Sequence, residues 1–412
     1  MNLKQRFESS WRRLGMKSNW KTVKLQELGR VVGGATPSTK NEAFYGGSIP
    51  WLTPKDLADY SERYISKGER SITEEGLNSC STELLPAGTV LFSSRAPIGY
   101  VAIASNPICT NQGFKSVVPD TGVVDPLFLY YLLVFNKEKI KSAGSGTTFK
   151  EVSGNVMKNI EVEIPTSVDY QRKIAQILGS IDNQIESNAR INKNLAEQIQ
   201  AFLNYVLSTG NENDAVRFGD LLYIKGRIGW KGLKKDEYLA NSDYRIINGE
   251  SLTPEGIDWT KTGFITQERY DESPEIMLKL GDILLSKDGT IGKIGYIDML
   301  DLPTTVASGI FVIRNSTKGE YGTPFLYYLL TSNRFKGFIK ARTEGSVIPH
   351  LYQKDFMEFT FPKPDPELLK QFNEFSQPLF ETIQNKIREN RQLAILRDKL
   401  LAKLLSGDIE IQ

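Results

Sequence analysis

Residues 171–206 read QRKIAQILGSIDNQIESNARINKNLAEQIQAFLNYV. Apolar and amide side chains recur in this segment with the alternating four-three spacing of a coiled-coil seam. The spacing recurs in residues 372–404, where every seam position is displaced by 198 residues. The predicted seam positions are Ile174, Leu178, Ile181, Ile185, Asn188, Asn192, Leu195, Ile199, Phe202 and Val206, then Phe372, Ser376, Leu379, Ile383, Lys386, Asn390, Leu393, Arg397, Leu400 and Leu404. An offset of nearly half the 412-residue chain indicates an internal duplication.

A block of mixed composition precedes each predicted helix. Residues 85–99 align with residues 278–292 at an offset of 193, and short apolar runs bounded by Gly, Pro and Asp indicate strands. The sequence LYYLL at 129–133 and again at 326–330 predicts a buried helix in each block. We therefore expect an α+β fold in which two β-rich domains are separated by a pair of long helices.

The two seam helices are predicted to pack on each other, because each carries an apolar stripe that must be buried. Antiparallel pairing suits the long connection between them and relates the halves by a pseudo-two-fold axis. In this alignment Asn188 falls near Asn390, and Asn192 near Lys386. Such polar side chains either fix the register of the pair or turn outward to solvent or to another protein, and the sequence leaves these alternatives open.

The predicted boundaries follow the duplication. Residues 210–214 read GNEND and supply the turn-forming side chains of a linker between the halves. The segments are a basic N-terminal segment 1–19, a first domain 20–166, a central helix 167–210, a second domain 211–364 and a C-terminal helix 365–412.

Composition is typical of a globular protein, with 40% hydrophobic and 24% charged residues and a net charge of +2. The first residues lack the apolar core of a signal peptide, and no apolar run approaches the roughly 20 residues of a membrane span. We expect a cytoplasmic protein without a membrane segment. Only Cys80, Cys109 and His350 could supply thiol or imidazole ligands, so no multi-ligand zinc site of that kind is expected.

Motifs of catalysis are missing from the sequence. No phosphate-binding loop with a Gly-Lys-Ser/Thr ending is present, and Gly33-Gly34 lacks the surroundings of a dinucleotide site. The Asn106-Pro107 pair is only a fragment of an adenine methyltransferase tetrapeptide, and a lone histidine is more typical of a packed or surface residue. We expect a non-catalytic chain with no metal site.

Residues 225–235 read KGRIGWKGLKK and contain five cations with a tryptophan and glycines. Lys and Arg neutralise phosphates, and glycine permits close approach to a nucleic-acid backbone. The corresponding part of the first half, residues 33–40, is another polar, glycine-rich loop. This pairing favours a binding function over the alternative of ordinary solvated loops.

These residues resemble the DNA-specificity (S) subunits of type I restriction-modification systems. The resemblance rests on 34–38 (GATPS), 47–52 (GSIPWL) and, most specifically, 170–178 (YQRKIAQIL) at the start of the central helix. It covers about residue 20 to Gly407. The second helix departs from the pattern, since 367–372 read ELLKQF.

The resemblance implies a non-catalytic subunit that reads a bipartite DNA target. Each target-recognition domain would read one half-site, while the helix pair would set the spacer and dock methyltransferase subunits. The implied partners are double-stranded DNA, two modification subunits and ATP-dependent restriction subunits. S-adenosylmethionine, ATP and Mg would be bound by those partners, and no cofactor by this chain. The alternative is a two-headed scaffold or ruler that binds protein or carbohydrate without DNA specificity; a self-contained methyltransferase is disfavoured by the missing motifs.

Base-reading residues cannot be transferred from the family, so contacts are predicted from the polar loops. Each candidate could equally be an ordinary exposed loop residue, although Arg95 has the side chain that bonds guanine at two atoms. The candidates are Thr36, Ser38, Lys40, Lys55, Arg95, Thr147, Thr148 and Lys150 in the first half, and Lys225, Arg227, Lys231, Lys234, Lys235, Lys287, Thr290, Ser346 and Tyr352 in the second.

Overall fold

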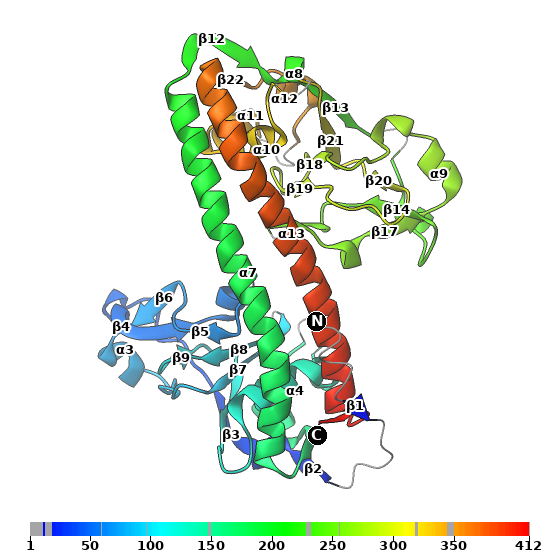
Figure 1. Ribbon diagram of the computed structural model, residues 1–412. Helices are drawn as coiled ribbons and strands as arrows, with labels where there is room; N and C mark the ends of the chain where they lie inside the picture. Colours follow the sequence, from blue (N-terminus) through cyan, green and yellow to red (C-terminus); the bar gives the residue numbers. More distant parts are fainter. Residues whose placement is uncertain are drawn as a thin grey trace. The chain divides into compact units, whose positions relative to one another are not determined.

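The computed structural model describes residues 11–12 and 19–411, apart from 59, 96, 147–149, 228–231, 255, 318–319 and 344–349. The chain forms two compact units (Figure 1). Unit 1 comprises residues 1–187 and 390–412, and unit 2 comprises residues 188–389. Both long helices, α7 (Val168–Ser208) and α13 (Pro366–Leu405), therefore contribute one part to each unit.

Unit 1 joins its β-rich domain to the first part of α7 and the last part of α13. Its strands form a five-stranded sheet in the order β3-β10-β7-β8-β5, a three-stranded sheet β6-β4-β9, and the pairs β11-β2 and β1-β23. The elements are β1 (Trp11–Arg12), β2 (Trp20–Lys24), α2 (Leu25–Leu28), β3 (Gly29–Gly33), η1 (Glu42–Phe44), β4 (Tyr45–Leu52), η2 (Pro54–Leu57), β5 (Tyr64–Ile65), β6 (Arg70–Ile72), α3 (Glu74–Asn78), β7 (Val90–Ser94), β8 (Ile98–Ala104), β9 (Cys109–Thr110), β10 (Lys115–Pro119), α4 (Pro126–Phe135), α5 (Lys137–Ser142), α6 (Gly154–Asn159), β11 (Glu161–Pro165) and β23 (Glu410–Ile411).

Unit 2 repeats this plan with the other parts of the two helices. Its sheets have the orders β13-β21-β18-β19 and β17-β14-β20, with the pairs β12-β22 and β15-β16. The elements are β12 (Asn211–Arg217), α8 (Phe218–Leu221), β13 (Leu222–Gly226), η4 (Lys235–Glu237), β14 (Tyr244–Ile247), β15 (Leu252–Thr253), β16 (Gly256–Ile257), η5 (Trp259–Lys261), β17 (Gly263–Ile265), α9 (Gln267–Asp271), η6 (Pro274–Ile276), β18 (Ile283–Ser286), β19 (Ile294–Tyr296), β20 (Thr304–Val306), β21 (Ile310–Asn315), α10 (Thr323–Thr331), α11 (Asn333–Thr343), α12 (Gln353–Met357) and β22 (Thr360–Lys363).

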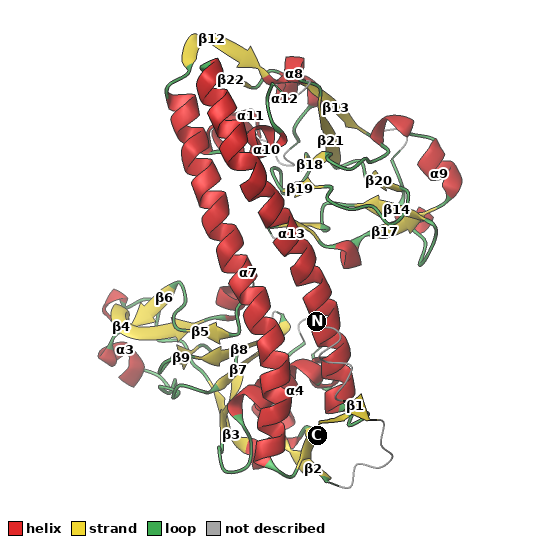
Figure 2. Ribbon diagram, in the orientation of Figure 1, coloured by secondary structure: helices red, strands yellow, loops and turns green. Residues whose placement is uncertain are grey.

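The two domains share one topology. In each three-stranded sheet the central strand pairs antiparallel with one neighbour and parallel with the other. The larger sheets place their strands in the same order, with one further strand, β5, in unit 1. The predicted α+β fold with a duplicated β-rich domain and a pair of long helices is confirmed (Figure 2).

The helices pair in antiparallel fashion within each unit, as predicted. In unit 1, Arg397 Nη1 lies 2.9 Å from Asp182 Oδ1, and Asn390 donates to the carbonyl of Ile185. In unit 2, the ring centroids of Phe202 and Phe372 are 5.5 Å apart. The partner number falls along α13 as the position in α7 rises, which defines the antiparallel direction.

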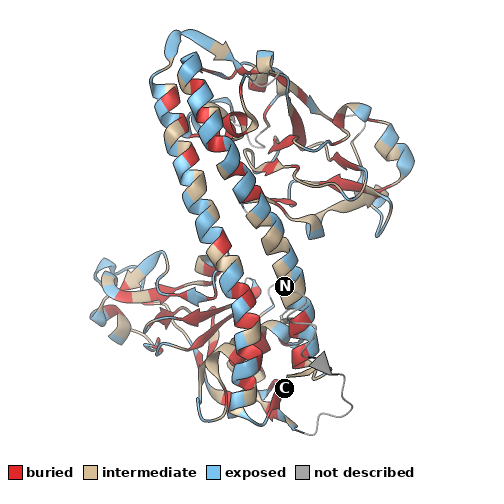
Figure 3. Ribbon diagram, viewed as in Figure 1, coloured by how far each residue is buried: buried red, intermediate tan, exposed pale blue. Residues whose placement is uncertain are grey.

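Each domain core includes side chains from both long helices (Figure 3). In unit 1, Leu400 and Leu404 of α13 pack with Leu178 of α7 and with the buried helix α4. In unit 2, Ile199 and Val206 of α7 belong to the core that also contains Phe372 and the helix α10. The seam residues thus stabilise the domains as well as the helix pair.

The start of each long helix explains why the sequence motif at 171 is not repeated. Gln171 is fully buried, and its amide nitrogen donates to the carbonyl oxygens of Val123 and Pro165 while its amide oxygen accepts from the backbone of Asp125. Leu369 occupies the corresponding position of α13 and is also buried. Apolar packing replaces the polar contacts there, so the heptad phase continues without the motif.

The N-terminal segment lies partly within the described residues. Strand β1 pairs antiparallel with β23, which follows the end of α13. This part of the segment therefore lies beside the end of the second long helix. Among the helices that the structure describes, none is long and apolar enough to cross a membrane.

Leu404→Ala is expected to destabilise unit 1, because Leu404 is fully buried and truncation leaves a cavity worth about 2–5 kcal/mol. Ile395→Ala is the control, since that side chain of the same helix is 56% exposed. Hydrogen exchange followed by mass spectrometry should show faster exchange in α4 and β11 for the first variant only. Faster exchange confined to residues 390–411 would contradict this account of the core.

Candidate nucleic-acid interface

The end of strand β7 forms a turn held by Ser93. The Ser93 hydroxyl donates to the carbonyl of Pro97 at 2.8 Å and accepts from the backbone N–H of Tyr100 at 2.8 Å. The serine satisfies backbone groups that the turn leaves without ladder partners. These two bonds fix the backbone at Pro97 and Tyr100 relative to the end of the strand.

Strand β18 ends in the same way in unit 2. The Ser286 hydroxyl donates to the carbonyl of Thr290 at 2.7 Å and accepts from the backbone N–H of Lys293 at 2.9 Å. The aligned serines thus make the same pair of hydrogen bonds in the two domains.

Two further loops bond to the residue that follows each serine. The backbone N–H of Ser94 donates to Gly113, and its carbonyl accepts from Val152, at 2.7 and 3.0 Å. Lys287 makes the same two bonds, to Gly309 and from Leu351, at 2.8 and 2.9 Å. Three loops therefore meet at one strand end in each domain, on the same backbone framework.

The side chains at the first strand end form a polar surface, which we call edge 1: Thr36, Arg95, Gln112, Lys115 and Glu151. The Thr36 hydroxyl bonds to the Gln112 side chain, and Lys115 Nζ donates to the Gln112 carbonyl at 3.3 Å. Glu151 lies 3.6 Å from Lys115 Nζ and 3.8 Å from Arg95 Nη1. Four loops distant in sequence are joined by these contacts into one charged, part-exposed surface.

The corresponding surface in unit 2 is edge 2: Lys287, Asp288, His350 and Tyr352. The His350 ring bonds to Asp288 and packs against the Tyr352 ring with centroids 4.5 Å apart. Lys287 Nζ lies 4.9 Å from the centre of the Phe311 ring. Burial lowers the pKa of the Lys287 ammonium, and the adjacent Asp288 carboxylate opposes that shift.

Several predicted contacts lie on or beside these edges. Thr36 and Arg95 belong to edge 1, and the exposed Lys150 adjoins Glu151. Lys287 and Tyr352 belong to edge 2, and Thr290 closes its serine turn through its carbonyl. Lys225 is exposed on strand β13, where its Nζ lies 5.8 Å from the centre of the Tyr223 ring. Tyr352 is 57% exposed, which suits a contact surface.

Other candidates are exposed but have local roles or lie in other loops. Ser38 and Lys40 are exposed in the loop before η1. Lys55 forms an ion pair with Glu69 at 3.0 Å, and the backbone of Lys234 is capped by Glu237. Thr147, Thr148, Lys231 and Ser346 lie outside the described residues, as does the side chain of Lys235.

The prediction for Arg227 is corrected by the structure. Its side chain is 2% exposed and donates to the carbonyl of Val306 and toward the hydroxyls of Ser273 and Thr305. Burial, followed by the neighbouring Arg269, lowers the pKa of the Arg227 guanidinium. A phosphate cannot reach this group in the structure, so we assign Arg227 to the domain core.

Five edge residues escaped prediction: Gln112, Lys115, Glu151, Asp288 and His350. Lys115 lies within a strand pattern, and Glu151 is one acidic residue among many. A signal was nevertheless present for Asp288, because it aligns with Arg95 at the 193-residue offset. A reversal of charge at an aligned turn position marks a difference between the halves.

Polar side chains also occur inside the helix pair, where they turn inward. Asn188 is fully buried, accepts from Lys386 and donates to Glu389, both at 3.0 Å. Lys386 was predicted to lie near Asn192, and in the structure its Nζ donates to Asn188, about one turn earlier along α7. The oxygen of Asn192 is buried without a hydrogen-bond partner in the described part of unit 2.

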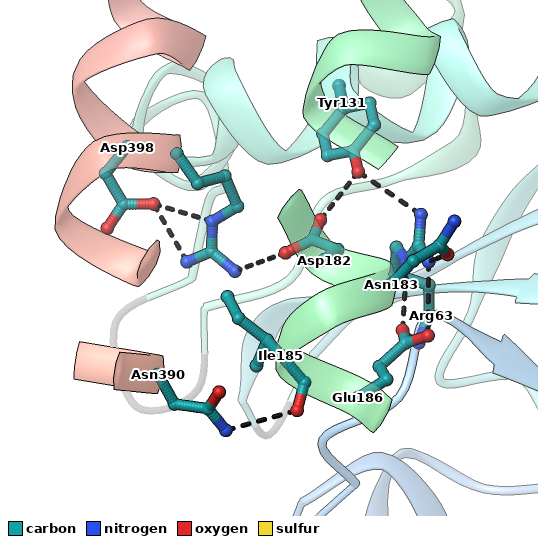
Figure 4. Close-up of polar contacts among 9 residues, drawn as sticks. Arg63, Tyr131, Asp182, Asn183, Ile185, Glu186, Asn390 and Asp398 are labelled. Atoms are coloured by element: carbon teal, nitrogen blue, oxygen red, sulfur yellow. Dashed lines mark hydrogen bonds and ion pairs between the residues drawn. The ribbon is translucent and has the colours of Figure 1, made fainter. Parts of the chain in front are cut away.

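A larger polar network joins the first domain to both helices in unit 1 (Figure 4). Asp182 of α7 accepts from Arg397 of α13 at 2.9 Å and from the Tyr131 hydroxyl of α4 at 2.6 Å. Arg63, which directly precedes β5, bonds to Glu186 of α7 at 2.9 Å. Burial and the Asp182 charge raise the pKa of Tyr131, so its hydroxyl remains a donor. The network holds the domain and both helices in one register.

A family model described as the type I restriction modification DNA specificity domain matches residues 17–197 and again residues 211–393. The chain belongs to this family. The two matches coincide with the two halves of the duplication, and each ends within one of the long helices.

Relatives in this specificity family extend over most of the chain. The type I restriction enzyme MjaIX specificity subunit of Methanocaldococcus jannaschii is 33% identical over 415 residues, covering 96% of this chain and 94% of that protein. The EcoR124I/EcoR124II specificity subunit of Escherichia coli is 31% identical over 174 residues, 41% of this chain and 42% of that protein. The crystal structure of a type I S subunit from M. genitalium has the same fold, with a TM-score of 0.57, 18% identity and coverage of 95% and 98%.

Arg227→Ala is expected to lower the free energy of unfolding by about 2 kcal/mol or more, because it removes a large buried side chain and leaves its acceptors without donors. Lys225→Ala is the matched control on strand β13, since that side chain is exposed. Its cost should stay within about 0.5 kcal/mol. Thermal unfolding of the two variants tests this. Equal melting temperatures would show that Arg227 does not stabilise the core and could contact DNA as first predicted.

Proposed function

We propose that this chain is the sequence-specific DNA-binding subunit of a type I restriction-modification complex. The observation that carries the proposal is the double match to the specificity family, whose two copies each contain one strand-end edge. The backbone bonds at the edges are equivalent, whereas the side chains differ. Each domain reads one half-site of a bipartite target, and the two half-sites have different sequences.

Direct contact with DNA is supported by the chemistry of the edges. Edge 1 presents Arg95 and Lys115, and edge 2 presents Lys287, beside part-exposed hydrogen-bonding groups. Cations position a protein on the phosphate backbone, and hydrogen-bonding side chains read base edges in the major groove. A surface of both kinds on each domain suits recognition of two separate half-sites.

The helix pair sets the spacing between the two half-sites and docks the modification subunits. Support comes from the polar contacts of the pair, since Asn188 with Lys386 and Asp182 with Arg397 resist a shift of register. A helical pair rises about 1.5 Å per residue along each helix, so a fixed register defines a fixed length.

Catalysis belongs to partner subunits in this proposal. Two modification subunits bind S-adenosylmethionine and methylate adenine, and restriction subunits use ATP and Mg to translocate and cleave DNA. This chain recognises the DNA sequence at which those partners act, and it binds no cofactor itself. Support comes from the relatives, which are specificity subunits by name, and the scaffold alternative finds no support among them.

Deletion of the gene in the source organism is expected to abolish adenine methylation at one bipartite motif, because the methyltransferase subunits lose the subunit that recognises their target sequence. Single-molecule sequencing of the genome with and without the gene measures this. Restoring the wild-type gene should restore methylation at that same motif. An unchanged set of methylated motifs would show that the chain does not direct methylation.

A further inference from the structure

Edges 1 and 2 present opposite charges at the same place in the fold. Arg95 of the first domain forms an isolated antiparallel bridge with Glu151. At the corresponding place in the second domain, Asp288 forms the same bridge with His350. In edge 1 the strand-end position carries an arginine opposite a glutamate, whereas in edge 2 it carries an aspartate opposite a histidine.

All four side chains are accessible to a ligand. Arg95 and Glu151 are 36% and 41% exposed, and Asp288 and His350 are 42% and 34% exposed. Among the described residues, the Arg95 guanidinium donates no hydrogen bond, since its ion pair with Glu151 spans 3.8 Å. Its donors therefore remain available to an incoming acceptor.

The backbone beneath each pair holds it in place. Residues 94 and 287 each bond to two flanking loops, and the serine before each closes a turn. A side chain on such a framework is oriented before its ligand arrives, which lowers the entropic cost of binding. The difference between the edges therefore resides in side-chain chemistry rather than in backbone shape.

We propose that positions 95 and 288 are equivalent base-reading positions at which the two domains select different bases. Arg95 donates two hydrogen bonds to N7 and O6 of a guanine in the half-site of the first domain. Asp288 can only accept, and it takes a hydrogen bond from the N4 amino group of a cytosine in the other half-site. This inference rests on the proposed function.

Glu151 and His350 act as positioning residues for these two readers. Glu151 lies between Arg95 and Lys115 and limits where either cation can move. His350 bonds to Asp288 and is itself packed against Tyr352. The backbone of Gly309 lies on another side of Asp288, where an added Cβ would be in ordinary van der Waals contact with the carboxylate at 3.4 Å.

Arg95→Lys tests the first position in the complete complex of this chain with its modification subunits. Lysine keeps the charge but loses the planar pair of donors. Discrimination for guanine should fall about 5- to 150-fold at one position of one half-site, the range that corresponds to one bidentate contact. The matched control is Arg30→Lys, an exposed arginine of the same domain that pairs with Glu83 away from edge 1.

Asp288→Asn tests the second position, because asparagine keeps the shape but adds a donor and prefers adenine. The preferred base at one position of the other half-site should change from cytosine to adenine. Asp271→Asn, the same change at an exposed site on α9, is the control. Methylation rates on a library randomised in both half-sites measure the preferred base at every position at once. Continued reading of the other positions of the altered half-site demonstrates that the variant domain is folded.

Exchange of the pair gives the sharpest test. The double variant R95D/E151H carries the edge 2 pair on the edge 1 backbone, so its domain should exchange guanine for cytosine at that position. If it still prefers guanine, or if Arg95→Lys leaves every position within twofold of wild type, the inference is wrong while bipartite methylation by the wild-type complex still stands. Absence of bipartite methylation by the wild type would instead overturn the proposed function.

Discussion

Burial of two apolar helix stripes against each other and against the domains is the constraint on which this structure depends. Each long helix is shared between the two units, and each unit's core takes residues from both helices. Leu404, close to the end of the chain, is part of the same core as α4 near residue 130. Because apolar burial is the main source of stability, neither domain core is complete without a helix from the other half of the sequence.

Polar groups in the helix pair give an otherwise apolar interface a defined register. The Asp182 carboxylate is held by Arg397 and Tyr131, and any shift of the helices would leave a buried charge without partners. The corresponding position in unit 2 is Phe380, which packs against Tyr328 with centroids 6.3 Å apart. The duplication thus preserved the position of the contact while its chemistry diverged from ionic to aromatic.

The same separation of backbone from side chain defines the candidate interface. Equivalent hydrogen bonds hold both strand ends, yet an arginine faces a glutamate in one and an aspartate faces a histidine in the other. A recognition surface built in this way can change its preferred base without a change of fold. Sequence-specific binding needs this property, because two half-sites must be distinguished by two copies of one domain.

The duplication, the heptad seams and the buried helices at 129–133 and 326–330 were determined by local pattern, and the antiparallel direction of the pair by the length of chain that connects the two helices. The spacing of apolar residues can be read directly from the sequence, and it matches the side-chain repeat of a helix or a strand. The hydrogen-bond partner of Lys386 is Asn188, whereas the sequence paired the lysine with Asn192, because heptad spacing repeats along a helix and does not by itself select among neighbouring contacts.

Only the tertiary structure decided which polar residues form a surface. Lys225 and Arg227 are two residues apart, yet one is exposed and the other lies in the core among Val306, Ser273 and Thr305. Edge 1 joins residues 36, 95, 112, 115 and 151, whose separations along the chain hide their proximity. Charge and loop composition identify polar segments, but burial and contact across loops depend on how the whole domain packs.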